Sequence, residues 1–364
     1  MLSYADDVSL FANSIVDIRE KLSILKEYCD LNGLTVNTTK TKIVSSFQYL
    51  GVSFSSTGKF RQASNHFISA GRLAISKVRN ILTNTLATQH SSRKKLINSI
   101  IKPVMLYSCE IWAYNYIDDL ERVQLQLKRL YNLPKSTPNS FVRLEYGLTP
   151  IIVTVFKAML SLIIKLLKLD ESRIPRICYN ILYNQSISTN NKNLGFINSF
   201  IDILSSINSL DIFSIQNPAI LKSEKSNLIK KIINKFQSED VQYVLNSKYN
   251  NLYRLISTYS DGELYLEMNC NIKKIRIVSQ LRLSNSKFSR IYFDNSLYIF
   301  DTENICLLCS SLSPDSLLHF LFHCSTLEPL RSFHINKYFS NNYTDKDKFE
   351  NLLSLSCKQQ IHDI

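Results

Sequence analysis

The first 60 residues alternate between short apolar runs and polar positions, and longer helical patterns follow them. The runs "LSY" (2–4) and "VSLFA" (8–12) flank an Ala-Asp-Asp tip, which is typical of a β-hairpin. Residues 14–34 predict a helix that ends near Gly33, because one helical face collects Ile15, Ile18, Leu22, Leu25 and Cys29. Residues 35–60 return to alternation, with a turn at Gly58.

The chain beyond about residue 60 has mainly helical periodicity. Gly (7) and Pro (8) are scarce in 364 residues, which favours long helices. The most apolar stretch, 151–169, is interrupted by Lys157, Lys165 and Lys168. It therefore predicts a buried core helix and no membrane span. Residues 184–193 are polar and predict a loop or linker. We expect an α+β, mainly α fold with two or three domains.

Positive charge points to a polyanionic partner. The formal net charge is +13, which favours nucleic acid as the partner and, after it, an anionic membrane. A basic protein with no polyanionic partner is the alternative interpretation. The lysines and arginines form several short runs in predicted helices that also contain aliphatic residues. The alternative interpretation of each run is therefore a solvated basic face opposite a buried apolar face. Together the runs predict tracking of a phosphate backbone: Arg93, Lys94, Lys95, Lys128, Arg129, Lys135, Lys230, Lys231, Lys235, Lys273, Lys274, Arg276 and Arg282.

The eight cysteines indicate a reducing compartment with one metal site. Five of them stand alone, whereas Cys306, Cys309 and Cys324 cluster. No signal peptide is visible, because Asp6 and Asp7 interrupt the first apolar run. We therefore expect an intracellular protein, in the nucleus or the cytoplasm.

The cysteine cluster predicts a zinc site with the spacing Cys306-x2-Cys309-x9-His319-x4-Cys324. Two thiolates on a turn, followed by an imidazole and a thiolate one helical turn apart, can converge on tetrahedral Zn²⁺. His323 offers an alternative Cys2His2 set with Cys324 spare. We favour Cys324, because zinc prefers thiolate ligands. Accidental clustering of these residues is the third interpretation.

The tetrapeptide Tyr-x-Asp-Asp occurs twice. The second copy, 116–119, precedes a helical pattern, so we expect Asp118 or Asp119 to be an N-cap. The first copy, 4–7, lies between strands. Two carboxylates at a hairpin tip repel each other unless a cation binds, and they suit the hard-oxygen ligation of Mg²⁺. A plain solvated turn is the alternative.

Several motifs in order resemble the reverse transcriptase of non-LTR (LINE-type) retrotransposons. "YADD" resembles the metal-binding hairpin of the palm, "GLTVNTTKTK" its next motif, and "FQYLG" the hairpin that grips the primer end. The segment from "IIKPVMLYSCEIWA" to "RLEYGLTPI" resembles the helical thumb, and the cysteine cluster resembles the Cys-Cys-His-Cys knuckle. The resemblance covers residues 1 to about 175 and returns near 275–332.

The resemblance implies an RNA-directed DNA polymerase that uses Mg²⁺ and Zn²⁺. Asp6 would ligate both Mg²⁺ ions beside Asp7, and Lys40 would act as general acid toward pyrophosphate. The implied binding residues of the hairpins are Tyr4, Tyr49, Leu50 and Gly51. The implied zinc ligands are Cys306, Cys309, His319 and Cys324. The implied partners are the element RNA, an RNA–DNA hybrid and the target DNA primer.

The expected organisation has five parts. They are a palm remnant (1–60), a helical thumb (61–175), a helical linker region (176–300), the zinc knuckle (301–332) and a polar tail (333–364). Polymerases of this family also need an Asp on a strand before the hairpin, together with fingers. Only three residues precede Tyr4. We therefore expect an N-terminally truncated fragment that is inactive alone; the alternatives are a non-catalytic RNA/DNA-binding protein with a zinc knuckle, or an unstable relic.

Purified chain with primer, template and Mg²⁺ is expected to give no primer extension above an Asp6→Ala control. Two carboxylates from one hairpin cannot clamp two metal ions in line. A gel assay of labelled primer measures this, and extension that depends on Asp6 would contradict the expectation.

Overall fold

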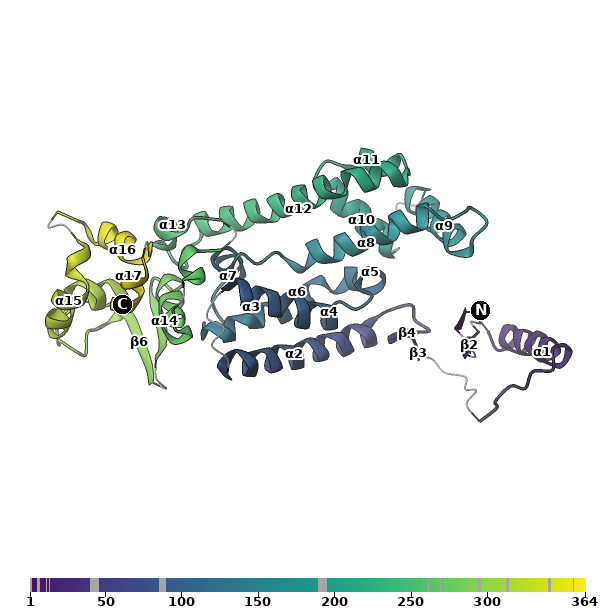
Figure 1. Cartoon of the computed structure of the whole chain (residues 1–364), viewed down its shortest axis with the longest axis horizontal. Helices are drawn as coiled ribbons and strands as arrows, with labels where there is room; N and C mark the ends of the chain where they lie inside the picture. The colour runs from purple at the N-terminus through teal and green to yellow at the C-terminus, as the bar shows by residue number, and fades with distance from the viewer. Residues whose placement is uncertain are drawn as a thin grey trace. The chain divides into compact units, whose positions relative to one another are not determined.

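The computed structural model describes residues 2–4, 7–10, 12, 14–39, 46–84, 90–188, 195–260, 262–268, 270–293, 296–311, 314–339, 342–355 and 357–364. The chain divides into two compact units, residues 1–60 and 61–364. Within the described residues the fold is mainly helical, with three small antiparallel sheets (Figure 1). The expected α+β, mainly α class is confirmed at this level.

The first unit contains two hairpins and a helix, namely β1 (Leu2–Tyr4), β2 (Asp7–Ser9), α1 (Ile15–Leu31), β3 (Ser46–Tyr49) and β4 (Val52–Ser55). Helix α1 begins after Ser14, whose side chain accepts a hydrogen bond of 3.1 Å from the backbone N–H of Asp17. It ends before Gly33, whose φ of 62° lies in the left-handed region that favours glycine. The hairpins and the helix agree with the sequence pattern.

The second unit is a helical body that ends in a small sheet. Its helices are α2 (Arg61–Asn84), α3 (His90–Leu96), α4 (Lys102–Met105), α5 (Cys109–Trp112), α6 (Ile117–Gln124), α7 (Asn139–Tyr146), α8 (Ile151–Leu167), α9 (Ile174–Ser188), α10 (Gly195–Ser205), α11 (Leu210–Ser214), α12 (Pro218–Asn246), α13 (Tyr253–Ile256), α14 (Ile272–Arg282), α15 (Glu328–His334), α16 (Asp345–Leu353) and α17 (Lys358–Asp363). Its strands are β5 (Phe288–Phe293), β6 (Ser296–Ile305) and β7 (Pro314–Asp315). Short 3₁₀ or π turns join them at 97–101, 113–116, 125–131, 264–267, 319–323, 325–327 and 336–338.

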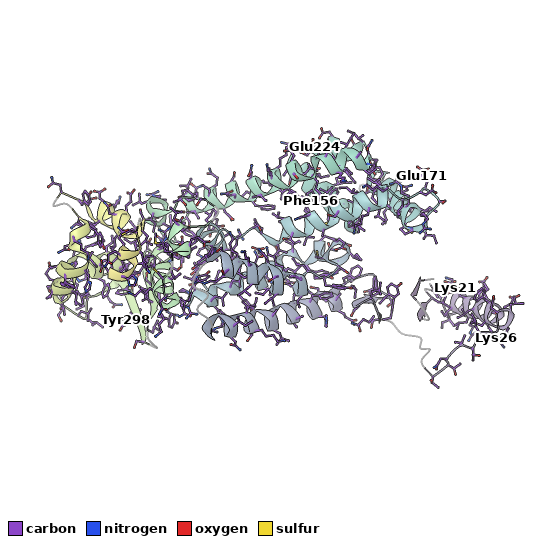
Figure 2. All side chains as sticks on the ribbon, in the orientation of Figure 1. Lys21, Lys26, Phe156, Glu171, Glu224 and Tyr298 are labelled. Carbon is purple, nitrogen blue, oxygen red and sulfur yellow. The ribbon has the colours of Figure 1, made fainter. Side chains whose placement is uncertain are left out.

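Helix α8 is the apolar centre of the second unit, as the sequence predicts. It packs against α5 and lies beside α12 (Figure 1). Phe156, labelled in Figure 2, is fully buried and stacks on Phe200 of α10 with ring centroids 5.0 Å apart. No single helix among the described residues is long and apolar enough to cross a membrane. The pair α7 and α8 reaches that length and composition together, but the two helices are bent by 72°.

A buried ionic network joins α7, α13, α14 and α16. Arg282, at the end of α14, is 0% exposed, and its Nε donates to Glu145 Oε1 at 2.8 Å. Its Nη2 lies 2.9 Å from Glu263 Oε2 and donates to the carbonyl of Ile256 at 3.1 Å. Its Nη1 donates to the carbonyl of Leu353. Because Arg282 is buried, the prediction that it belongs to a phosphate-tracking surface is wrong.

Two segments differ from the sequence prediction in secondary structure. Residues 288–293 and 296–305 form an antiparallel pair of strands, with Phe288 opposite Asp301, whereas the sequence pattern predicts helix up to residue 300. The expected polar tail, 333–364, contains α16 and α17. Helix α16 begins with a capping box, and apolar side chains from both helices are buried, namely Phe349, Leu352, Leu353 and Ile361.

Residues 61–364 form one compact unit, and the expected boundaries within it stay predictions. The predicted linker at 184–193 is also partly helical. Helix α9 continues to Ser188, and residues 189–194 lie outside the described part of the chain.

Replacing Arg282 by Met is expected to lower the free energy of unfolding by about 3–5 kcal/mol, because two buried carboxylates then lose their counter-charge. Urea denaturation followed by circular dichroism measures the loss. The matched control is Arg72→Met, at an exposed position of α2, which should change stability by less than about 0.5 kcal/mol. A loss for Arg282→Met as small as that of the control would contradict the importance of the network.

Candidate metal centre

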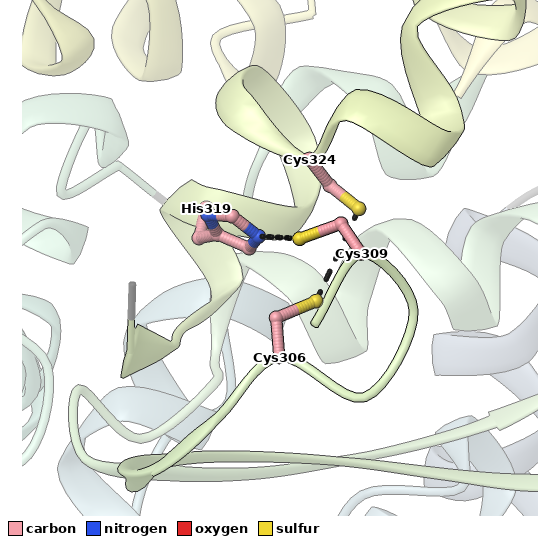
Figure 3. Close-up of side chains that lie close together, drawn as sticks. All are labelled: Cys306, Cys309, His319 and Cys324. Carbon is pink, nitrogen blue, oxygen red and sulfur yellow. Dashed lines mark hydrogen bonds between the residues drawn. The ribbon is translucent and has the colours of Figure 1, made fainter. Parts of the chain in front are cut away.

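Four candidate zinc ligands converge near the C-terminal end of the second unit. Cys306 follows β6, Cys309 lies on the next turn, and His319 and Cys324 bracket the π turn at 319–323. One ligand atom from each residue lies within 4.8 Å of all the others (Figure 3). Two of these approaches are 3.3 Å between Cys309 Sγ and His319 Nε2 and 4.0 Å between Cys306 Sγ and Cys324 Sγ. Three sulfurs and one imidazole nitrogen fit the donor set of a structural zinc site.

Local hydrogen bonds hold these ligands in place. The backbone N–H of Ser310 donates to the carbonyl of Cys306 at 2.8 Å and closes the turn between the first two thiols. Arg331, which is buried, donates from Nη2 to the carbonyl of Cys324 at 2.8 Å. A guanidinium fixed under one ligand orients that ligand without contacting a metal itself. The sequence does not predict this contact, because only the fold brings the Arg331 side chain back to Cys324.

The two thiols of the turn differ in acidity. Hydrogen bonding with Ser311, whose Oγ lies 3.2 Å from Cys309 Sγ, lowers the pKa of Cys309 to about 6. Burial raises the pKa of Cys306. The thiolate is the form that ligates metal, so one ligand of the set is readily ionised near neutral pH.

His323 is not one of the four side chains that converge. Its Nε2 lies 2.7 Å from Asp345 Oδ2 in the first turn of α16, and the side chain is half exposed. Asp345 is distant in sequence, so the spacing of the histidines gives no sign of this contact. The geometry therefore favours the set with Cys324 over the Cys2His2 alternative.

The Asp-Asp hairpin of the first unit is described only in part. Tyr4 ends β1 and faces Asp7, the first residue of β2. The predicted metal ligand Asp6 and the predicted general acid Lys40 lie outside the described residues. The roles of Asp6, Asp7 and Lys40 stay predictions.

The second hairpin presents its turn to solvent. Tyr49 pairs with Val52, and Leu50 and Gly51 form the turn with φ values of 47° and 78°. Two residues with positive φ match the twist of a tight hairpin, but this conformation is strained for leucine. Leu50 is 53% exposed, so an apolar side chain stands at the tip.

The second Tyr-x-Asp-Asp copy has a structural role. Tyr116 occupies the N-cap of α6, and Asp118 and Asp119 lie in the first turn, so the expectation of an aspartate N-cap is wrong. One oxygen of the Asp119 carboxylate lies 3.1 Å from Arg61 Nη1, and the other lies 3.1 Å from Arg122 Nη1. Acidic residues in a first turn are favoured by the helix dipole, so this pair needs no metal.

The basic runs divide into buried and exposed residues. Arg93 and Lys128 are buried like Arg282, so they cannot track a phosphate backbone as predicted. Lys128 Nζ donates to the carbonyl of Thr137 and, at 2.9 Å, to Asn139 Oδ1, and burial lowers its pKa to about 8. The exposed members of the runs are Lys95, Arg129, Lys135, Lys230, Lys231 and Lys273.

Chain purified without metal and refolded with zinc is expected to hold about one zinc ion, because structural zinc binding is coupled to folding. Mass spectrometry of the metal content measures the ratio. Cys306→Ser should lose the ion, whereas the matched control His323→Ala should keep it, since the His323 ring contacts Asp345. A ratio near zero for the native chain would contradict the zinc site, and loss of zinc from His323→Ala would favour the Cys2His2 set.

Comparison with known protein families identifies one relationship. Residues 1–54 match the family described as reverse transcriptase (RNA-dependent DNA polymerase). No curated protein and no solved structure gives a significant match to the chain. The matched segment holds both hairpins and helix α1, and it supports a reverse transcriptase domain in this part of the chain.

Proposed function

We propose that the chain belongs to the reverse transcriptase of a non-LTR retrotransposon, an RNA-directed DNA polymerase. The observation that carries the proposal is the match of residues 1–54 to reverse transcriptases, a segment that includes the Asp6–Asp7 hairpin. The non-LTR type is supported by the order of the motifs after that hairpin. It is also supported by the Cys-Cys-His-Cys spacing, whose four ligand atoms converge.

In this proposal the hairpins of the first unit serve polymerisation. Asp6 and Asp7 would hold Mg²⁺, which supplies charge neutralisation and activation of the attacking hydroxyl when bound. Lys40 would donate a proton to the leaving pyrophosphate. The turn from Tyr49 to Gly51 would contact the primer end, where the exposed Leu50 offers an apolar surface to a sugar or a base.

We also propose that the second unit of the chain binds nucleic acid. The helical second unit exposes many of its lysines and arginines, and the net charge of +13 favours a polyanion. The zinc knuckle would stabilise the segment between β6 and α15. The expected partners are the element RNA, an RNA–DNA hybrid and the DNA primer at the target site.

The native chain is expected to bind a labelled RNA hairpin and an RNA–DNA hybrid with strongly salt-dependent affinity. Between about 50 and 200 mM salt the affinity should fall roughly a thousandfold if about six phosphates are contacted. Fluorescence anisotropy measures the binding. A peptide nucleic acid of the same sequence, which lacks phosphates, is the matched control and should not bind. Affinity that stays flat with salt would contradict the proposal.

A further inference from the structure

An open groove of the second unit collects cationic side chains from four separate segments. It has a volume of about 790 Å³ and is lined by the C-terminal part of α2, the segment 129–136, helix α14 and strand β5. Of the described residues that line it, none is an Asp or a Glu. The cations of the lining are Arg79, Arg129, Lys135, Lys273, Arg276 and Arg290.

The walls of the groove are fixed to one another by hydrogen bonds. Arg276 Nε on α14 donates to the carbonyl of Leu130 at 2.7 Å, which joins α14 to the segment 129–136. The side chain of Gln280 holds β5 to α14. Its Oε1 accepts from the backbone N–H of Tyr292 at 2.6 Å, and its Nε2 donates to the carbonyl of the same residue at 3.2 Å. The spacing between the two walls is therefore set before any ligand arrives.

The floor of the groove is also held from within. Asn132 has a φ of 55°, and the N–H of Leu133 donates to the carbonyl of Lys128 at 3.0 Å, so the chain turns sharply after the helical segment. The buried ammonium of Lys128 donates to Thr137 and Asn139 on the far side of the turn. These contacts place the exposed side chain of Lys135 at the groove.

Electrostatics make the groove receptive to a polyanion. Burial lowers the pKa of Arg276, and repulsion from the nearby charges of Arg79 and Arg93 lowers it further. Like charges held together in a groove focus a positive potential, which raises the local concentration of an anionic ligand. Tyr292 lies at the same groove and is 42% exposed, so an aromatic ring stands among the cations.

We propose that this groove binds a single-stranded segment of nucleic acid, with its cations on the phosphates and Tyr292 against a base. Cationic side chains interleaved with an exposed aromatic ring are the combination that binds unpaired strands with little sequence preference. A paired helix covers its base faces and would leave the ring of Tyr292 without a stacking partner. The inference rests on the proposed function, because it assigns one binding surface to a chain proposed to bind nucleic acid.

The test compares two full-length variants with equal changes in net charge. Lys273→Glu/Arg290→Glu reverses two exposed charges of the groove, and the control variant Lys157→Glu/Lys222→Glu reverses two exposed charges on α8 and α12 that belong to none of the predicted basic runs. The probe is a labelled oligouridylate of about 15 nucleotides. The groove variant should bind it at least about tenfold more weakly and with a shallower salt dependence, by roughly 1.4 in the logarithmic slope for two lost phosphate contacts. The control variant should bind like the native chain.

A third variant tests stacking separately. Tyr292→Ala keeps the backbone groups that pair with Gln280 and should weaken binding about fivefold or more without changing the salt slope. Circular dichroism of each variant checks folding. If the Lys273/Arg290 variant is unfolded, Arg79→Glu/Lys135→Glu replaces it, since both of these side chains are exposed in the same groove.

The outcomes separate this inference from the proposed function. A native chain that binds the probe, together with groove variants that bind equally well, overturns the groove and leaves the proposed function standing. A native chain that binds neither this probe nor the RNA hairpin overturns both. Preferential binding of the native chain to phosphatidylserine vesicles would overturn the groove as a nucleic-acid site and assign it to a membrane surface.

Discussion

Arg282 lies at the end of α14, where its guanidinium is fully buried between the carboxylates of Glu145 and Glu263. Taking each ion out of water costs several kcal/mol unless the partners are in place with good geometry. The burial of Arg282 is therefore favourable only when helix α7, the segment around Glu263 and helix α14 are all in place. The bonds from Arg282 to the carbonyls of Ile256 and Leu353 extend this constraint to α13 and α16. The C-terminal third of the chain is thus built into the helical body.

The position of α14 in turn sets both surfaces with candidate functions. Its outward side carries Lys273 and Arg276 into the basic groove, and Gln280 holds β5 at the groove edge. Strand β5 pairs with β6, which leads directly to Cys306, the first thiol of the Cys/His cluster. A fixed helix therefore connects the groove and the cluster through two paired strands. A zinc ion at the cluster would stabilise the far end of that connection.

The sequence predicts helices and strands well where the local pattern of residues is sufficient to specify them. Both hairpins, helix α1 and the buried helix α8 follow from alternation, helical periodicity and apolar length. The sequence pattern predicts helix up to residue 300, where strands β5 and β6 form, because the basic run before them has a helical pattern and the pairing of the strands is not visible locally. The polar composition of the final segment predicts a tail. Its signal was present in the helical spacing of Phe349, Leu352 and Leu353, which the structure buries.

By itself the sequence determined the chemistry available to this protein: an Asp pair at a hairpin tip, a Cys-Cys-His-Cys spacing and a large positive charge. Tertiary structure decided which charged and metal-binding groups are buried in the core, which line a groove and which converge on one site. Arg282 meets Glu145 across 137 residues and becomes a core residue, while Arg79, which belongs to none of the predicted basic runs, lines one groove together with Arg290. His323 contacts Asp345 and is not one of the four converging side chains. The reason is physical: spacing along the chain specifies geometry over one or two turns, whereas burial and charge pairing depend on partners that only folding brings near.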